Sequence, residues 1–309
     1  VGTDEFSITN LKPQYQSLLV FKQDQTFIVT PETNPLFSDN PGLNPFNYPY
    51  RDLNEAVGNI APNMVQLIEN NPLTLDGFSM WIWSSATSVE DERNAKIISD
   101  RIKLSLQDLD LSGAVTFDYQ NQKEYWLNIG TVVYVWNYGN DTFYKYTNFK
   151  ATQYFDVDGI PYYGSTDGTV EKVSAEFKAD GTLLGATIPC KMKLGFNDFG
   201  ALEHRKSMWS EWVAISPASR TSLNIKFVTD RKNEEESKTL TVGYAFFDFE
   251  NIDFDDFTFL TNKNPQPARL RGKIKKFTWL QVIFENETND ETLTILKLLL
   301  QAQAQGFSR

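Results

Sequence analysis

AVTFDYQNQKEYWLNIGTVVYVWNYGNDTFYKY (Ala114–Tyr146) is the stretch that decides the fold of this 309-residue chain. Its segments alternate apolar and polar residues, are rich in aromatic side chains, and are separated by turns of Gly, Asn and Asp, a pattern typical of antiparallel strands. Leu18–Thr30, Met64–Trp83 and Thr152–Val173 repeat this pattern. If Phe21, Leu67, Phe117 and Phe155 end equivalent strands, the period is roughly 40 to 50 residues, which is typical of propeller blades. The sequence therefore predicts an all-β fold in which residues 1–180 form blades of a β-propeller, complete or partial.

The pattern changes after about residue 180. The remaining segments are longer alternating stretches joined by polar turns, which is typical of a two-sheet sandwich. The last of them, ETLTILKLLLQAQAQ (residues 291–305), contains strong helix formers and could also be helical. We interpret it as a strand because its polar residues alternate along the chain. The sequence thus predicts a C-terminal β-sandwich domain over residues 181–309.

One helix is expected among the blades, over Glu90–Leu109. The apolar residues of this stretch fall at helical spacing, and acidic residues occupy its first turn, where they suit the helix dipole. The apolar positions are Ile98, Ile102, Leu106 and Leu109. This pattern favours a single inserted helix that packs on the blades, with contact to a partner as the alternative.

The composition restricts the classes of partner. The chain has 29 Lys and Arg against 40 Asp and Glu, a net charge of −11. Such a surface repels the phosphate backbone, so extended wrapping of nucleic acid is not expected, although solubility alone would produce the same balance. The sequence has no apolar run long enough to span a membrane. The single cysteine, Cys190, lies in an alternating apolar stretch and is predicted to be buried.

Few residues have the spacing of a catalytic or metal site. The single histidine, His204, lies among charged residues and is predicted to be a solvated turn residue, so a Ser–His–Asp triad and a multi-histidine zinc site are not supported. Asp156–Gly159 resembles the start of a calcium loop but lacks its later ligands, and we interpret it as a tight turn. No phosphate-binding loop or nucleophile elbow occurs. We expect no cofactor and no metal.

Two features keep carbohydrate-related functions open. Asp248, Glu250, Asp253, Asp255 and Asp256 lie among phenylalanines in residues 247–257, and paired carboxylates are what a glycoside hydrolase uses. Tryptophans could instead serve as stacking platforms for a glycan-binding module. The candidates are Trp81, Trp83, Trp126, Trp136 and Trp209. Exposed, clustered tryptophans would favour glycan binding, and buried ones would favour a structural role.

Two stretches are candidate interfaces. Pro31–Tyr50 contains five prolines, so it cannot form a central strand or a long helix, and its rings are Phe37, Phe46, Tyr48 and Tyr50. It is either an excursion pinned to the protein surface by these rings or an arm that grips a neighbouring subunit. The second stretch is basic, and alternation would place four cations on one strand face, either solvated or in contact with an acidic partner or passing DNA. These cations are Arg269, Arg271, Lys273 and Lys275.

Taken together, these segments resemble the propeller of tail and neck proteins of tailed bacteriophages. The resemblance is carried by LLVFKQDQTFIVT, MWIWSS, YWLNI, VYVWNY and YYGSTDGTVEKV in the first half, and by MKLGFNDFGALEHRKSMWSEWVAISP and the ending FTWLQVIFENETND in the second. It spans nearly the whole chain through individually loose motifs and departs from the family in Pro31–Tyr50. The opening VGTDEFSITNLKPQYQSLLVFK is similar to a mid-propeller segment, so further blades are expected upstream of Val1.

The resemblance implies a structural component of the virion, located in the tail or neck after assembly in the host cytoplasm. Such a protein is a tail-tube, nozzle or head–tail connector subunit that forms an oligomeric ring around the DNA exit channel. Its implied partners are copies of itself and other tail or neck proteins, and DNA passes it without specific binding. A glycan-binding tail module for host attachment is the first alternative, and a glycoside hydrolase is the second. No residue-level binding site transfers from the family.

Overall fold

The computed structural model describes residues 6–36, 42–85, 93–173, 188–216, 220–230, 238–245, 266–270, 274–287 and 293–307. Strands dominate these residues, and the single α-helix found among them is short, which confirms the predicted all-β class. The chain divides into two compact units, Val1–Ser174 and Ala175–Arg309. The domain boundary expected after residue 180 falls in 174–187, which lies outside the described residues.

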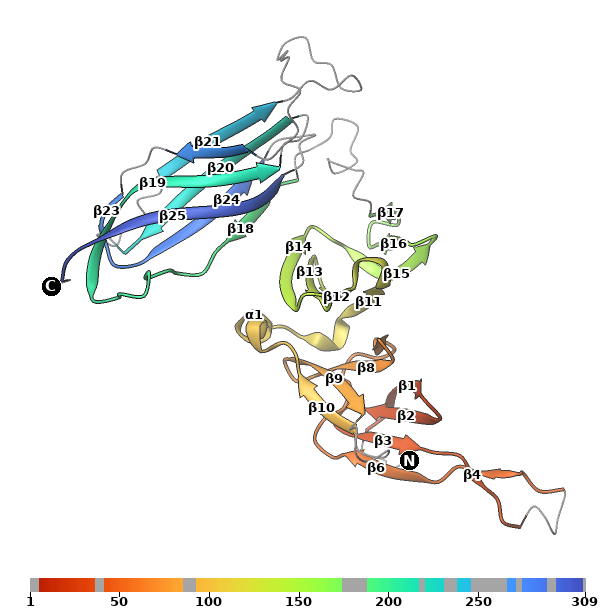
Figure 1. The fold of residues 1–309 in the computed structure, drawn as a ribbon. Coiled ribbons are helices and arrows are strands. Elements are labelled where there is room, and N and C mark those ends of the chain that lie inside the picture. The colour runs from red at the N-terminus through yellow and green to blue at the C-terminus, as the bar shows by residue number, and fades with distance from the viewer. Residues whose placement is uncertain are drawn as a thin grey trace. The chain divides into compact units, whose positions relative to one another are not determined.

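Four antiparallel sheets follow one another in the described part of the N-terminal unit (Figure 1). Each of the four repeated sequence stretches lies in a different one of these sheets, as the repeat predicts. The first sheet has β1 (Ile8–Gln14), β2 (Ser17–Lys22), β3 (Thr26–Val29) and β6 (Tyr50–Asn54), and the second has β7 (Gln66–Ile68), β8 (Asn71–Asp76), β9 (Ser79–Ser85) and β10 (Arg93–Ile97). The third has β11 (Val115–Tyr119), β12 (Glu124–Ile129), β13 (Val132–Asn137) and β14 (Thr142–Thr147), and the fourth has β15 (Ala151–Val157), β16 (Ile160–Ser165) and β17 (Val170–Lys172).

The strand equivalence assumed from the sequence holds for three of its four markers. Leu67, Phe117 and Phe155 lie in β7, β11 and β15, the first strands of their sheets, but Phe21 lies in β2, the second strand of its sheet. The first strand there is β1. First strands of neighbouring sheets contact one another, β7 with β11 and β11 with β15.

Hydrophobic clusters join each sheet to the next. Phe21 of the first sheet meets Trp83 of the second edge-on, with ring centroids 5.9 Å apart. In the third sheet, β12 alternates: Tyr125 packs in the cluster shared with the second sheet, and Trp126 packs in the cluster shared with the fourth. Because successive side chains of a strand point to opposite faces, one aromatic strand serves two interfaces.

The prediction of one helix over Glu90–Leu109 is wrong. Arg93–Ile97 is strand β10, which pairs with β9, and the only α-helical turn described in this stretch is α1 (Lys103–Leu106), after a 3-10 turn at Asp100–Ile102. Residues 86–92 lie outside the described residues. Hydrogen bonding to β9 outweighs the helical pattern. The apolar stripe nevertheless faces the core between the second and third sheets, since Leu106 is buried in it and Ile98, Ile102 and Leu109 are partly buried against it.

Two further 3-10 turns, Leu111–Gly113 and Gln120–Gln122, flank β11. A small hairpin of β4 (Glu32–Thr33) and β5 (Phe46–Asn47) leaves the first sheet between β3 and β6.

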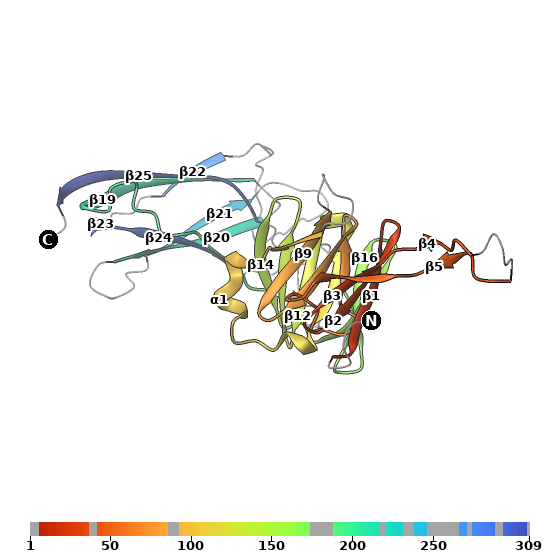
Figure 2. The ribbon, with the colours of Figure 1, turned by 90° about the horizontal axis from the view of Figure 1, so that it is seen from below.

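The C-terminal unit contains two sheets that share one core. One sheet is formed by β18 (Cys190–Lys193), β24 (Leu280–Asn286), β20 (Arg220–Thr229) and β21 (Lys238–Ala245). The other is formed by β22 (Gln266–Leu270), β19 (His204–Ser216), β23 (Ile274–Phe277) and β25 (Thr294–Phe307). Figure 2 shows β19, β22 and β25 in one layer and β20, β21 and β24 in the other.

The strand prediction for the C-terminal segment is confirmed. β25 pairs with β19 from His204↔Phe307 to Ser216↔Thr294. Its Ile295, Leu298, Leu300 and Ala302 pack against the core of this unit. The long partner strand therefore overrides the helix propensity of the leucines and glutamines.

Two single-residue predictions need correction. Cys190 is exposed, because it opens β18, a four-residue strand whose side chains are all exposed and which pairs only with β24 among the described strands. His204 is the first residue of β19 and is partly buried, so it is not a solvated turn residue.

Candidate interaction surface

The most distinctive surface feature is formed by residues 30–36 and 42–50, which we name the arm; residues 37–41 between them lie outside the described residues. The arm contains the β4–β5 hairpin and projects away from the first sheet (Figure 1). At its base the N–H of Thr30 donates to the carbonyl of Pro49 over 3.4 Å, and further out the N–H of Asn34 donates to Pro45 over 2.9 Å. The arm is therefore closed by its own backbone.

Asparagine side chains stabilise the arm's shape. Asn34 Nδ2 donates to the carbonyl of Asn44 over 2.9 Å. Asn34 Oδ1 accepts from the N–H of Leu36, and Asn44 Oδ1 accepts from the N–H of Phe46, over 3.1 and 3.0 Å. Such Asx turns, combined with the restricted φ of proline, reduce the number of conformations available to the segment. The arm is a preshaped projection.

Its rings are turned to solvent. Phe46, Tyr48 and Tyr50 have 47%, 58% and 53% of their surface exposed. Of these, Tyr50 meets Phe27 of the first sheet edge-on at 6.2 Å. The interpretation of an excursion pinned by its rings is therefore not supported at Phe46 and Tyr48, while Phe37 lies outside the described residues. Phe46 and Tyr48 are therefore exposed rings on a projecting segment, accessible to a partner.

The arm carries no Lys or Arg. Glu32 is the charged residue among its described residues, and the sequence between its two parts adds Asp39. An arm without cations cannot hold a phosphate backbone, because nucleic-acid affinity depends on Lys and Arg. The chemistry of the arm fits an apolar protein surface.

The predicted basic face is divided between two strands. Arg269 lies in β22 and Lys275 in β23, both exposed, while Arg271 and Lys273 lie outside the described residues. The guanidinium of Arg269 lies 5.4 Å from the ring centre of Trp212, and its Nη2 donates to Ser210 Oγ over 3.1 Å. These contacts hold Arg269 against β19.

The tryptophans are mostly interior. Trp83, Trp126 and Trp136 are buried between sheets of the N-terminal unit, and Trp81 is partly buried. Trp209, in β19 of the C-terminal unit, is exposed. Within the described residues these five side chains form no exposed platform, which favours a structural role over glycan binding.

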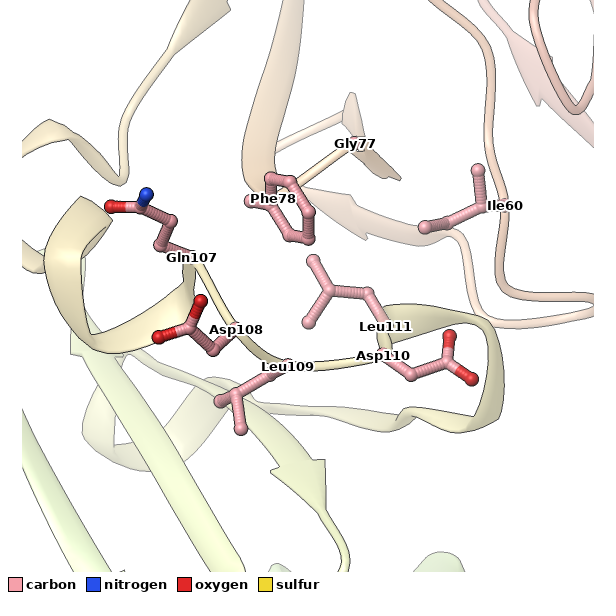
Figure 3. Close-up of a pocket in the computed structure, with 8 residues that line it drawn as sticks. All are labelled: Ile60, Gly77, Phe78, Gln107, Asp108, Leu109, Asp110 and Leu111. Carbon is pink, nitrogen blue, oxygen red and sulfur yellow. The ribbon is translucent and has the colours of Figure 1, made fainter.

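A shallow pocket lies beside α1 (Figure 3), lined by Ile60, Gly77, Phe78 and residues 107–111. It contains two carboxylates, Asp108 and Asp110, which point away from one another in Figure 3. Asp110 accepts a 2.9 Å hydrogen bond from the N–H of Ser112, and the hydroxyl and N–H of Ser112 lower the pKa of this carboxyl. The pocket therefore offers no converging acid–base pair of the kind that cleaves a glycosidic bond.

The third sheet has two further carboxylates that could act as catalysts. Asp118 lies directly opposite Tyr125, and Glu124 lies directly opposite Tyr119. Because Tyr125 and Glu124 are neighbours on one strand, the two carboxylates point to opposite faces of the sheet. They cannot act together on one substrate.

Each of these carboxylates is bound by aromatic side chains. Glu124 accepts from Trp126 Nε1 over 2.9 Å and from the hydroxyl of Tyr144. Asp118 accepts from the hydroxyl of Tyr138 over 3.3 Å. Burial raises the pKa of Asp118 above its ordinary value, and burial together with the charge of Asp118 raises the pKa of Tyr138 to about 12. The bond from Tyr144 to Glu124 joins β14 to β12, and the bond from Tyr138 to Asp118 joins the turn after β13 to β11.

The remaining sequence candidates do not form a metal or catalytic site in the described residues. Asp156 Oδ1 accepts from the N–H of Gly159 over 2.9 Å, which confirms the tight turn between β15 and β16. No group of three or more potential metal ligands occurs in the described part of the chain. None of the helices in that part is long and apolar enough to cross a membrane. The acidic run at residues 247–257 lies outside the described residues.

One exposed apolar surface was not predicted from the sequence. It lies on the fourth sheet, where Phe155, Val157 and Val170 are exposed. Their alternation was visible, but the sequence did not show which face another sheet would cover.

Comparisons with known proteins give limited similarity. No protein-family model and no curated protein matches the chain. Among solved structures, it is similar to an exo-β-1,3-galactanase from Phanerochaete chrysosporium, with 7% identity, a TM-score of 0.29, and coverage of 94% of this chain and 80% of that one.

Two other solved structures show comparable similarity. The S. cerevisiae core factor matches with 10% identity, a TM-score of 0.34, and coverage of 93% of this chain and 48% of that one. A glycoside hydrolase family 43 arabinoxylan arabinofuranohydrolase from Bacillus subtilis matches with 10% identity, a TM-score of 0.23, and coverage of 96% and 78%. At these TM-scores we draw no functional argument from any of the three.

Proposed function

We propose that this chain is a structural component of a tailed-phage virion, a tail-tube, nozzle or head–tail connector subunit that assembles with copies of itself around the DNA exit channel. The observation that carries the proposal is the burial of Trp83, Trp126 and Trp136 between successive sheets. Aromatic strands used in this way build a rigid stack, and these three indoles are not accessible to a substrate.

The finer architecture belongs to the same proposal. We infer that the four sheets of the N-terminal unit are blades of a propeller, and that the two sheets of the C-terminal unit form a β-sandwich. The succession of first strands from β7 to β11 to β15, with aromatic clusters between neighbouring sheets, supports the propeller. The shared core of two sheets supports the sandwich.

The surface chemistry is compatible with a channel protein. A chain of net charge −11 does not retain passing DNA, and the arm, which has no Lys or Arg and exposes aromatic rings, offers an interface to another protein.

Ring assembly is the property to test in the purified chain. We expect size-exclusion chromatography with multi-angle light scattering to give a molar mass of several times the 35.4 kDa of one chain. The expectation follows from the exposed apolar surface of the arm, which is most stable when covered. A mass equal to one chain at every accessible concentration would count against the ring.

A further inference from the structure

The net charge of the chain comes entirely from its N-terminal unit. Residues 1–174 contain 11 Lys and Arg against 22 Asp and Glu, which gives a net charge of −11. Residues 175–309 contain 18 of each sign, which gives a net charge of zero, and the two sets together account for the 29 cations and 40 anions of the chain. One unit is therefore strongly acidic, and the other is neutral as a whole.

Cations gather on the outer face of one sheet of the C-terminal unit. Val213 of β19 and Leu298 of β25 lie opposite one another and face the shared core. Because strand side chains alternate, their neighbours Trp212, Leu299 and Lys297 point outward. The first two of these lie directly opposite one another, and Leu299 and Lys297 are exposed.

The strands on the other side of β19 continue this face. Arg269 of β22 is exposed, lies opposite Trp212, and holds its guanidinium 5.4 Å from the centre of that ring. On β23, Ile274 packs in the core, so Lys275 beside it points outward and is exposed. The cationic face, as we name it, consists of Trp212, Arg269, Lys275, Lys297 and Leu299.

No acidic side chain of these four strands balances the cations. Strands β19, β22, β23 and β25 contain six Lys and Arg but one Asp or Glu, Glu211. Glu211 is fully buried and lies opposite Leu300, which packs against the core, so it is on the inner side of the sheet. Lys275 and Lys297 form no ion pair among the described residues.

The opposite sheet of the same unit provides a contrast. Glu285 of β24 is flanked by two lysines, with Lys191 Nζ 2.6 Å from its Oε1 and Lys226 Nζ in contact with its Oε2. Those cations are compensated within the unit. The exposed lysines of the cationic face would gain such a carboxylate only from another surface.

We propose that the cationic face binds the acidic N-terminal unit of a second copy of this chain. Opposite charges attract the two surfaces, while contact between two acidic N-terminal units is repulsive. Trp212 and Leu299 add apolar contact area beside the charges. The contact joins different surfaces of two copies, and such a contact produces a ring when its rotation closes. The inference rests on the proposed virion function and identifies an interface that the ring would use.

Zero-length crosslinking tests the contact, because a carbodiimide joins a lysine only to a carboxylate that touches it. Copies of the full chain labelled with ¹⁴N and ¹⁵N are mixed at high ionic strength, dialysed together to low ionic strength, and treated with the reagent. We expect crosslinked peptides that join Lys275 or Lys297 to Asp or Glu of residues 1–174, with one light and one heavy partner. Their yield should fall as salt is raised from about 0.05 to about 0.5 M, since salt screens exposed charges.

Charge-reversed variants provide the matched control. Lys297→Glu is expected to reduce the crosslinks of Lys275 about tenfold, because it places a like charge against the acidic partner. Lys275→Glu should do the same to the crosslinks of Lys297. Lys193→Glu makes the same change of net charge at an exposed position of β18 on the opposite sheet, and it should leave both sets unchanged. Circular dichroism establishes that the three variants are folded.

Three results would overturn the proposal. The first is the absence of crosslinks from Lys275 and Lys297 that join a light and a heavy copy. The second is crosslinks that reach only carboxylates of residues 175–309, which would show that the face is neutralised by its own unit. The third is equal yields in Lys297→Glu and Lys193→Glu. None of these results bears on whether the chain occurs in virions, which is decided by the composition of the particle.

Discussion

Replacing Trp126 with alanine is expected to lower the free energy of unfolding of the N-terminal unit by about 3–5 kcal/mol, the range for large aromatic residues removed from a core. The indole is 1% exposed and meets Phe117 and Tyr154 edge-on, with centroids 5.8 and 5.7 Å apart. The substitution also removes the Nε1 donor of Glu124, which leaves a buried carboxylate with one partner fewer.

Urea unfolding followed by circular dichroism measures this effect, with the two units fitted as separate transitions. Trp209→Ala is the matched control, because this indole is 46% exposed in the C-terminal unit, and its loss should cost about 1 kcal/mol or less. Equal effects of the two substitutions would contradict the burial of aromatic rings between sheets.

Gly58→Ala is expected to be the second most damaging single change. A Cβ at this position would lie 2.4 Å from the carbonyl oxygen of Lys22 and 2.7 Å from the backbone nitrogen of Asp24. These are backbone atoms of the first sheet, so they cannot move aside as a flexible side chain would. The same carbonyl of Lys22 accepts from the N–H of Asn59 over 2.7 Å, and displacement would weaken that bond. We expect a loss of about 2–3 kcal/mol, as for an overpacked core.

Thermal and urea unfolding of the variant measure this loss. Gly113→Ala is the control, since nothing lies within 4 Å of its added Cβ and its φ is not positive. It should change the free energy of unfolding by less than about 0.5 kcal/mol. A Gly58→Ala protein as stable as Gly113→Ala would show that the first sheet and the segment that follows β6 are not in close contact.

The fold class could be predicted because period-2 alternation and turn residues are local signals. The strand at residues 294–307 was predicted against its helix propensity on the same basis, and pairing with β19 confirms it. The prediction of a helix over Glu90–Leu109 is wrong because the spacing of its apolar residues indicates which side chains are buried. The spacing does not indicate which strand the segment pairs with. Leu106 is buried in the core and Ile98 packs against it, yet Arg93–Ile97 pairs with β9, and no local pattern identifies that pairing.

The candidate surface was predicted only in part. Five prolines among aromatic residues marked the arm, but only tertiary structure shows that Phe46 and Tyr48 are uncovered. The exposed apolar surface of the fourth sheet was missed because Tyr154 and Phe155 look alike in sequence. Which of the two is buried depends on which side the third sheet occupies, and that is not encoded in the strand itself.

The most direct test of the central claim, a structural role in a tailed-phage virion, is mass spectrometry of purified particles from the source of this chain. The account predicts abundant peptides from both units, at a copy number comparable with known tail or neck proteins. Absence of these peptides from intact particles, with the chain detected in the infected-cell lysate, would contradict it.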